Sequence, residues 1–334
     1  MRAQITMHVA AILQRQEFLL KLARALMMFG APTHKLESQI QHTARVLEVS
    51  ARTVYLPNLM LISFGDEATR TSETRFIKQT ASLDLTKLTD MHDIYWAVVR
   101  DRISVTEASE QLDELMRRKP LIPRLPTILI GGLCSAFICP GPMGFGGSFL
   151  DALAAFPLGM FLVFCQGVIT TELYSNVFEI VFCMLNSFVA AALHSTGLFC
   201  YSAVVSGSIV LILPGYLVLS GALELQSKNL IAGSVRLVYA LIYSLFLGQG
   251  LSIGVDFWTL VHNRPLDNAA TCDIRHHDPA FWYRHNVELI WAFLTVPGYS
   301  IMLSLRNQAK VQRKEFPIMV SNPSSSLYSS KVES

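Results

Sequence analysis

The sequence predicts a polytopic α-helical membrane protein with an N-terminal cytosolic α+β domain. The main evidence is a stretch from Leu125 to Ser227 that contains no Lys or Arg among long apolar blocks. Hydrophobic residues make up 51% of the chain and charged residues only 16%, against roughly 25% charged in soluble domains. A cation at mid-bilayer costs roughly 2.5 to 3.5 kcal/mol, so spanning segments exclude bases. The middle of the chain is therefore predicted to lie in a membrane.

Composition divides the chain into three regions. Residues 1–120 are mixed and charge-rich, residues 121–305 are lipid-like, and residues 306–334 begin basic and become Ser-rich. We expect a folded cytosolic domain, a transmembrane domain and a disordered cytosolic tail, because a segment poor in apolar residues cannot pack. The net charge of +2 gives no reason to expect nucleic acid as a partner.

Apolar residues at helical spacing predict two helices at the start of the chain, over residues 12–28 and 33–47. Gly30 and Pro32 supply the break between them, because glycine ends helices and proline cannot continue one.

A β-hairpin is predicted to follow these helices. Residues 53–64 are rich in strand-forming side chains and end at Gly65-Asp66, and residues 69–78 are suited to the return strand. Pro57 would confine the first strand to a sheet edge, because proline has no N–H for the ladder.

Two more helices complete the predicted domain. Apolar spacing indicates one over residues 85–99. Ser104 and Glu107 have the spacing of a capping box, in which each side chain satisfies a free backbone N–H, and they open a helix that runs to Arg118.

Six segments are apolar and long enough to cross a bilayer, which takes roughly 20 residues. They are residues 126–146, 149–168, 177–197, 201–223, 230–253 and 287–304. Bases precede the first of them and follow the last, so the positive-inside rule puts both flanks in the cytosol. These bases are Arg117, Arg118, Lys119 and Arg124 before, and Arg306, Lys310, Arg313 and Lys314 after. The loop at 255–286 then faces away from the cytosol.

The third predicted span carries a mostly polar face. Glu179, Cys183, Asn186, Ala190 and His194 recur at intervals of three or four residues, which places them along one side of a helix. One interpretation is a path for substrate or protons, because Glu179 and His194 can both change protonation. The other is polar contact between helices, and the sequence does not separate the two.

Charged residues near the inner ends of the fourth and fifth spans form a second candidate group. Glu224 and Arg236 are predicted to pair, either as a structural ion pair or with Arg236 holding a substrate carboxylate. Asp151 and Glu172 lie near predicted membrane boundaries and are interpreted as solvated carboxylates.

Glycine, proline and small residues mark breaks and close contacts. Pro214-Gly215 interrupts the fourth span, where a broken helix would expose backbone groups. Small residues within 190–192, 206–208 and 248–254 predict close helix packing.

The sequence gives no support for a cofactor, metal site or enzymatic mechanism. His262, Cys272, His276, His277 and His285 in the long loop lack the repeated spacing of metal ligands. His34 and Glu37 supply at most two ligands. Five of the six cysteines lie in apolar segments and are expected to be small hydrophobic residues without a disulfide framework.

Several short motifs, in order, resemble one known family. They are Met27-Met-Phe-Gly-Ala-Pro-Thr-His-Lys-Leu-Glu37, Thr43-Ala-Arg-Val-Leu47, Asn176-Val-Phe-Glu179, Leu213-Pro-Gly-Tyr216, Leu223-Glu-Leu225, Ala292-Phe-Leu-Thr-Val-Pro297 and Leu305-Arg-Asn-Gln-Ala309. Together they resemble the threonine/serine exporter family, and most of all its fungal branch, which is named after a pheromone-regulated membrane protein.

The resemblance implies a cytosolic N-terminal domain followed by more spans than this chain contains, and proton-driven export of threonine and serine as in bacterial relatives. The matching positions are His34, Glu37, Asn176, Glu179, Pro214, Gly215, Glu224 and Arg236. Where the family continues into further spans, this chain has Lys310 to Lys314 and a Ser-rich tail. An altered gene model, a transport-incompetent product, and one subunit that needs a second polypeptide are three open explanations.

The predicted function is therefore that of a secondary transporter exporting threonine or serine by alternating access. Glu179, Asn186 and Asn176 would line the path, Glu179 or His194 would carry a proton, and Arg236 would hold substrate or Glu224. The expected partners are a small amino acid, the lipid bilayer, and a homo-oligomeric copy or second subunit. The alternatives are a small dicarboxylate exporter subunit and a transport-incompetent regulatory or scaffold protein.

Overall fold

The computed structural model describes residues 2–66, 71–80, 82–140, 144–169, 172–263, 283, 291–311 and 316–317. The chain forms two compact units. The first unit consists of Met1–Pro120 with Gly215–Ala240, and the second consists of Leu121–Pro214 with Leu241–Ser334. The sequence grouped 215–240 with the spans, whereas the structure packs this segment with the N-terminal domain.

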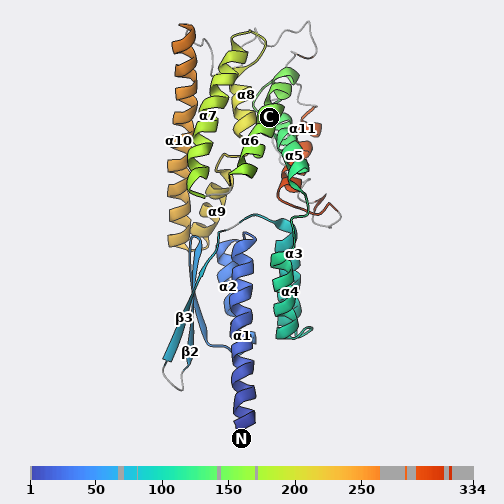
Figure 1. Ribbon diagram of the computed structural model, residues 1–334, viewed down its shortest axis with the longest axis vertical. Helices are drawn as coiled ribbons and strands as arrows, with labels where there is room; N and C mark the ends of the chain where they lie inside the picture. The colour runs from blue at the N-terminus through green and yellow to red at the C-terminus, as the bar shows by residue number, and fades with distance from the viewer. Residues whose placement is uncertain are drawn as a thin grey trace, which may run out of the picture. The chain divides into compact units, whose positions relative to one another are not determined.

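The first unit combines helices with a three-stranded antiparallel sheet in the order β1-β2-β3 (Figure 1). Its elements before residue 120 are α1 (Arg2–Met28), α2 (Thr33–Val46), β1 (Ala51–Leu56), β2 (Leu59–Asp66), β3 (Thr71–Lys78), α3 (Leu85–Val99) and α4 (Val105–Arg117). Helix α1 contacts the other three helices and strands β2 and β3. It forms the centre of the core, where Phe18, Leu22 and Leu26 are fully buried.

The break between α1 and α2 lies where the sequence predicted it. Gly30 has a φ of 78°, a left-handed conformation that glycine adopts without a Cβ clash. The N–H of Ala31 donates to the carbonyl of Leu26 at 3.0 Å, which satisfies one of the last free carbonyls of α1.

The predicted first strand at 53–64 is wrong, because this segment is itself a hairpin. Leu56 pairs with Leu59, so Pro57 and Asn58 form the turn. Asn58 has a φ of 63°, which asparagine tolerates better than most residues, and Pro57 has no N–H to donate to a ladder. Gly65 and Asp66 continue β2, and the predicted return strand is confirmed as β3.

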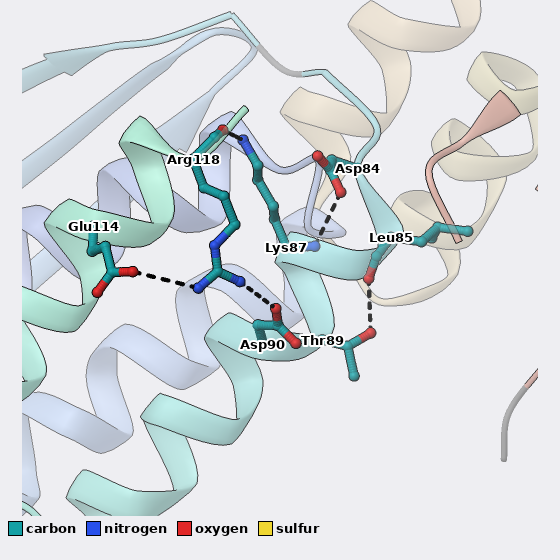
Figure 2. A network of polar contacts seen from close by, with 7 residues as sticks. All are labelled: Asp84, Leu85, Lys87, Thr89, Asp90, Glu114 and Arg118. Atoms are coloured by element: carbon teal, nitrogen blue, oxygen red, sulfur yellow. Dashed lines mark hydrogen bonds and ion pairs between the residues drawn. The ribbon is translucent and has the colours of Figure 1, made fainter. Parts of the chain in front are cut away.

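Polar side chains join α3 to α4 (Figure 2). Asp84 caps α3 by accepting the N–H of Lys87 at 3.0 Å, and the ammonium of Lys87 donates to the carbonyl of Arg118. The Arg118 guanidinium in turn lies 3.4 Å from Asp90 and 3.7 Å from Glu114. At the start of α4, Ser104 accepts the N–H of Glu107 as predicted. These contacts fix the two helices against each other.

A helical hairpin completes the first unit. It consists of α9 (Gly215–Gln226) and the part of α10 (Leu230–His262) that ends at Ala240. A Cβ added to Gly233 would lie 2.8 Å from the carbonyl oxygen of Gly221, so the two backbones touch. Ala232 is fully buried in the same core as α1.

The second unit is helical. It contains α5 (Arg124–Ile138), α6 (Phe149–Val168), α7 (Glu172–His194), α8 (Tyr201–Ile209), the remainder of α10 and α11 (Ala292–Arg306). Helix α5 contacts α6, α8 and α11. Buried residues of α6, α7, α8 and α10 form its main core.

Three helices within the described residues are long and apolar enough to cross a membrane: α6, the part of α7 over Val177–His194, and α10. The predicted first span ends early, at Ile138, and Pro140 follows in an irregular segment. The predicted fourth span is divided into α8 and α9, with Pro214 directly before α9. Of the predicted sixth span, residues 287–290 lie outside the described residues, and the described part contains α11 from Ala292. The predicted loop at 255–286 and tail at 306–334 lie mostly outside the described residues.

Close helix packing is confirmed at several predicted small residues. A Cβ on Gly254 would lie 2.5 Å from the carbonyl oxygen of Met184, and one on Gly207 would lie 3.1 Å from Cys139. Gly248 differs, because a Cβ there would meet nothing within 4 Å. Ala190 and Ala191 are fully buried.

The interpretation of Asp151 as a solvated carboxylate is wrong. Asp151 is 1% exposed and forms a capping box with Ser148 at the start of α6. Its other oxygen accepts the N–H of Cys200 at 2.8 Å. A carboxylate that accepts several N–H groups is stable away from water, which the sequence alone did not show.

The expectation that the cysteines of the apolar segments are small hydrophobic residues without a disulfide framework is wrong for Cys200. Cys200, at the start of α8, is disulfide-bonded, whereas Cys134, Cys139, Cys165 and Cys183 are free.

Candidate functional site

The polar face predicted on α7 is turned into the second unit. Cys183 and Ala190 are fully buried and Asn186 is 2% exposed, whereas Val181 and Val189 on the opposite side are about two-fifths exposed. This agrees with the prediction that the polar face avoids lipid. The side chain of Asn176 lies outside the described residues.

Glu179 is held by two neighbouring helices. The hydroxyl of Tyr243 on α10 donates to one carboxylate oxygen, and the amide nitrogen of Gln166 on α6 donates to the other at 3.5 Å. Both partners are neutral, so neither of them supplies a counter-charge to the carboxylate. Sequence reasoning did not select Gln166 or Tyr243, although each is a polar side chain within a predicted span.

Arg306 joins this group from α11. Its Nη2 donates to the amide oxygen of Gln166 at 2.9 Å, and its Nη1 is shielded from solvent without an acceptor among the described residues. From its sequence position Arg306 is one of the bases that follow the last predicted span, and in the structure its guanidinium also contacts Gln166 on α6. A base in the last turn of a helix is common because of the helix dipole, so its position gave no signal of a buried role. We name Gln166, Glu179, Tyr243 and Arg306 the Glu179 cluster.

Asn186 and His194 do not belong to the Glu179 cluster. Asn186 lies two turns from Glu179, about 10 Å along the helix, and its amide nitrogen donates to Ser208 on α8. Its amide oxygen is buried without a donor among the described residues. The Nδ1 of His194 is 3.1 Å from the carbonyl oxygen of Phe199. The predicted path residues on α7 therefore contact different partners at different points along the helix.

The predicted pairing of Glu224 and Arg236 is confirmed, and it lies in the first unit. Their closest nitrogen and oxygen atoms are 2.9 Å apart, and Glu224 is 1% exposed. The hydroxyl of Thr33 donates to the same Glu224 oxygen, and Arg236 donates to the hydroxyl of Tyr55 at 3.2 Å. We name Thr33, Tyr55, Glu224 and Arg236 the Glu224 cluster. It joins α2, β1, α9 and α10.

Of the other predicted site residues, some make contacts within the fold, and others have side chains outside the described residues. Glu37 accepts the backbone N–H of Tyr55 at 3.0 Å, which anchors β1 to α2. The side chain of His34 lies outside the described residues. Gly215 is the first residue of α9, directly after Pro214. The described residues contain no group of three or more His, Cys, Asp or Glu side chains placed to hold a metal.

The family described as "Putative threonine/serine exporter" matches residues 17–258, which include part of each unit, the whole Glu224 cluster and every residue of the Glu179 cluster except Arg306. The chain belongs to this family. It is therefore an integral membrane protein of a transporter family, as the apolar helices of the second unit also indicate.

Fungal proteins named pheromone-regulated membrane protein 10 are similar over nearly the whole chain. The Pichia sorbitophila protein is 42% identical over 324 residues, which cover 96% of this chain and 31% of that protein. The Eremothecium gossypii protein is 42% identical over 322 residues, 95% of this chain and 41% of that protein. The Candida albicans (strain WO-1) protein is 41% identical over 96% of this chain and 28% of its own length. This chain thus spans well under half the length of these relatives. No solved structure matches it.

Proposed function

We propose that the chain forms part of a proton-coupled exporter of small amino acids such as threonine and serine, and that the Glu179 cluster is its substrate and proton site. The observation that carries this proposal is the grouping of polar and ionisable side chains from three other helices around Glu179 on α7: Gln166 and Tyr243 contact its carboxylate, and Arg306 contacts Gln166. Ionisable residues between membrane helices are costly and typically mark substrate or proton paths. Asn186, with its free buried acceptor, would continue the path along α7 towards His194.

The proposed orientation places the N-terminus in the cytosol. Disulfides persist in oxidising compartments, so the bond at Cys200 favours a non-cytosolic location for the turn between α7 and α8. His194 is then at the outer end of α7 and Glu179 nearer the inner end. The bases that precede α5 support the same orientation by the positive-inside rule.

Export of a dicarboxylate is the weaker proposal. It would need Arg236 as a second cation, and that guanidinium already pairs with Glu224 and Tyr55. A carboxylate substrate would have to displace a buried ion pair, which is unfavourable because the displaced Glu224 would be left without its counter-ion.

An efflux assay tests the role of Glu179. Proteoliposomes that contain the purified chain are loaded with labelled threonine, and a proton gradient is applied. Glu179→Gln keeps the shape of the side chain but cannot carry a proton, so we expect at least about a tenfold loss of rate. Asp256→Asn is the control, because it removes an exposed carboxylate on α10 of the same unit. Equal rates for the wild type and Glu179→Gln would refute the proposed role.

A further inference from the structure

Gln166 lies between two charged groups of opposite sign. Its amide oxygen accepts a hydrogen bond from the Arg306 guanidinium at 2.9 Å, and its amide nitrogen donates to the Glu179 carboxylate at 3.5 Å. Cation, amide and carboxylate therefore follow one another across the second unit, from α11 through α6 to α7. The amide is oriented with its acceptor towards the cation and its donor towards the anion.

Arg306 is incompletely satisfied in this arrangement. No carboxylate lies within 4.0 Å of its guanidinium among the described residues, and its Nη1 has no acceptor there. A guanidinium has five donors in a fixed fork that suits a carboxylate bidentately. Buried charges in proteins are usually paired, so a guanidinium that has an unused donor among the described residues, beside a membrane-embedded carboxylate, is suited to bind an anionic group.

An α-amino acid has the polarity that this site requires. Its carboxylate and ammonium are attached to the same carbon, much as the oxygen and nitrogen of an amide are, and they accept and donate in the same sense. A zwitterion in the position of the Gln166 amide would place its carboxylate on Arg306 and its ammonium on Glu179. Each of the two hydrogen bonds that it replaces joins one charged group to a neutral amide, whereas the zwitterion would make both of them bonds between opposite charges.

We propose that Arg306 binds the carboxylate of the transported solute, that Glu179 binds its ammonium, and that the Gln166 amide lies where the carboxylate and ammonium would bind. This rests on the proposed function, because it assigns the parts of the same site. It selects zwitterions over dicarboxylates, since the cluster presents one cation and one anion. Tyr243 is a positioning residue that orients Glu179 through its hydroxyl.

Binding of labelled threonine to the full chain in detergent tests this assignment, alongside efflux by the wild type. Arg306→Gln should weaken threonine binding by about tenfold or more, because a charge-assisted pair is lost. Threoninol lacks the carboxylate, so its own inhibition constant, obtained by competition and corrected for the affinity of threonine, should be high in the wild type and unaffected by Arg306→Gln. Arg124→Gln is the matched control, because it removes an exposed base from α5 of the same unit.

Gln166→Ala separates this proposal from a purely structural role. Removing the amide that competes with threonine for this position should tighten threonine binding several-fold. If Gln166 makes only a structural contact, its loss would weaken threonine binding or leave it unchanged. A monodisperse elution profile confirms that each variant is folded. If the wild type exports threonine but Arg306→Gln binds it normally, the assignment of Arg306 is wrong while the transport proposal stands. If the wild type neither binds nor exports threonine, both proposals fail.

Discussion

The two charged clusters of this protein contain similar residues and arrange them in opposite ways. In the Glu224 cluster, Arg236 lies 2.9 Å from its carboxylate, and hydroxyls from α2 and β1 contact the same pair. In the Glu179 cluster, a neutral amide separates Arg306 from Glu179. The first arrangement neutralises its charges internally, and the second keeps them apart.

This difference indicates different roles. Removing one partner of a buried ion pair strongly destabilises the folded protein, because the other charge stays buried without its counter-ion. The Glu224 cluster is therefore suited to joining the hairpin of α9 and α10 to the N-terminal domain. Both clusters contain one buried atom without a partner among the described residues, Glu224 Oε2 and Arg306 Nη1. Glu224 has its counter-ion beside it, whereas Arg306 has none there. Only the second cluster thus has capacity for a charged ligand.

The largest expected effect is on the stability of the first unit. Arg236→Met leaves Glu224 buried without its cation, which typically costs about 3 to 5 kcal/mol. The temperature at which half the protein remains monodisperse in detergent should fall by several degrees. The double variant Arg236→Met with Glu224→Leu should recover most of this loss, because no charge is left unpaired. Equal stability of Arg236→Met and the wild type would show that the Glu224 cluster does not stabilise the first unit, which contradicts the role assigned to it.

A smaller effect is expected from packing in the second unit. Gly254→Ala places a Cβ within 2.5 Å of the Met184 carbonyl oxygen, which forces α10 away from α7 and should cost about 1 to 3 kcal/mol. The displacement should also weaken the bond of Tyr243 to Glu179 and slow efflux. Gly248→Ala is the control, because its Cβ meets nothing and alanine favours the helix. Thermal stability and efflux of the two variants, measured side by side, would show whether this contact matters.

The smallest effect is expected from an ion pair at the surface of the first unit. Lys21 donates to Asp113 at 2.7 Å, and this bond raises the pKa of Lys21 above its usual 10.5. Because the folded pKa is raised, the stabilisation is complete below about pH 10 and disappears as pH rises through the folded value. Asp113→Asn should therefore cost only about 0.5 kcal/mol at pH 8. Melting curves at pH 8 and pH 11 should show this difference shrinking, and a constant difference would contradict the assignment.

Much of the architecture could be predicted from local sequence. The helices beginning at Thr33, Leu85 and Val105 and the span at 149–168 agree with the structure, because apolar spacing, caps and glycine act within a few residues. The hairpin turn at Pro57-Asn58 was missed because the strand-forming residues on both sides form one continuous run. Local chemistry at Pro57 pointed to an edge strand, whereas the pairing register shows a turn.

Sequence by itself determined that the chain is a membrane protein, that the face of α7 with Cys183, Asn186 and Ala190 is buried, and that Glu224 and Arg236 pair. Each follows from composition, from helical period or from two opposite charges in neighbouring segments. Tertiary structure decided the burial of Asp151 and the grouping of Gln166, Tyr243 and Arg306 around Glu179. These residues are far apart along the chain, and whether an isolated charge faces solvent or a buried amide depends on which helices pack together.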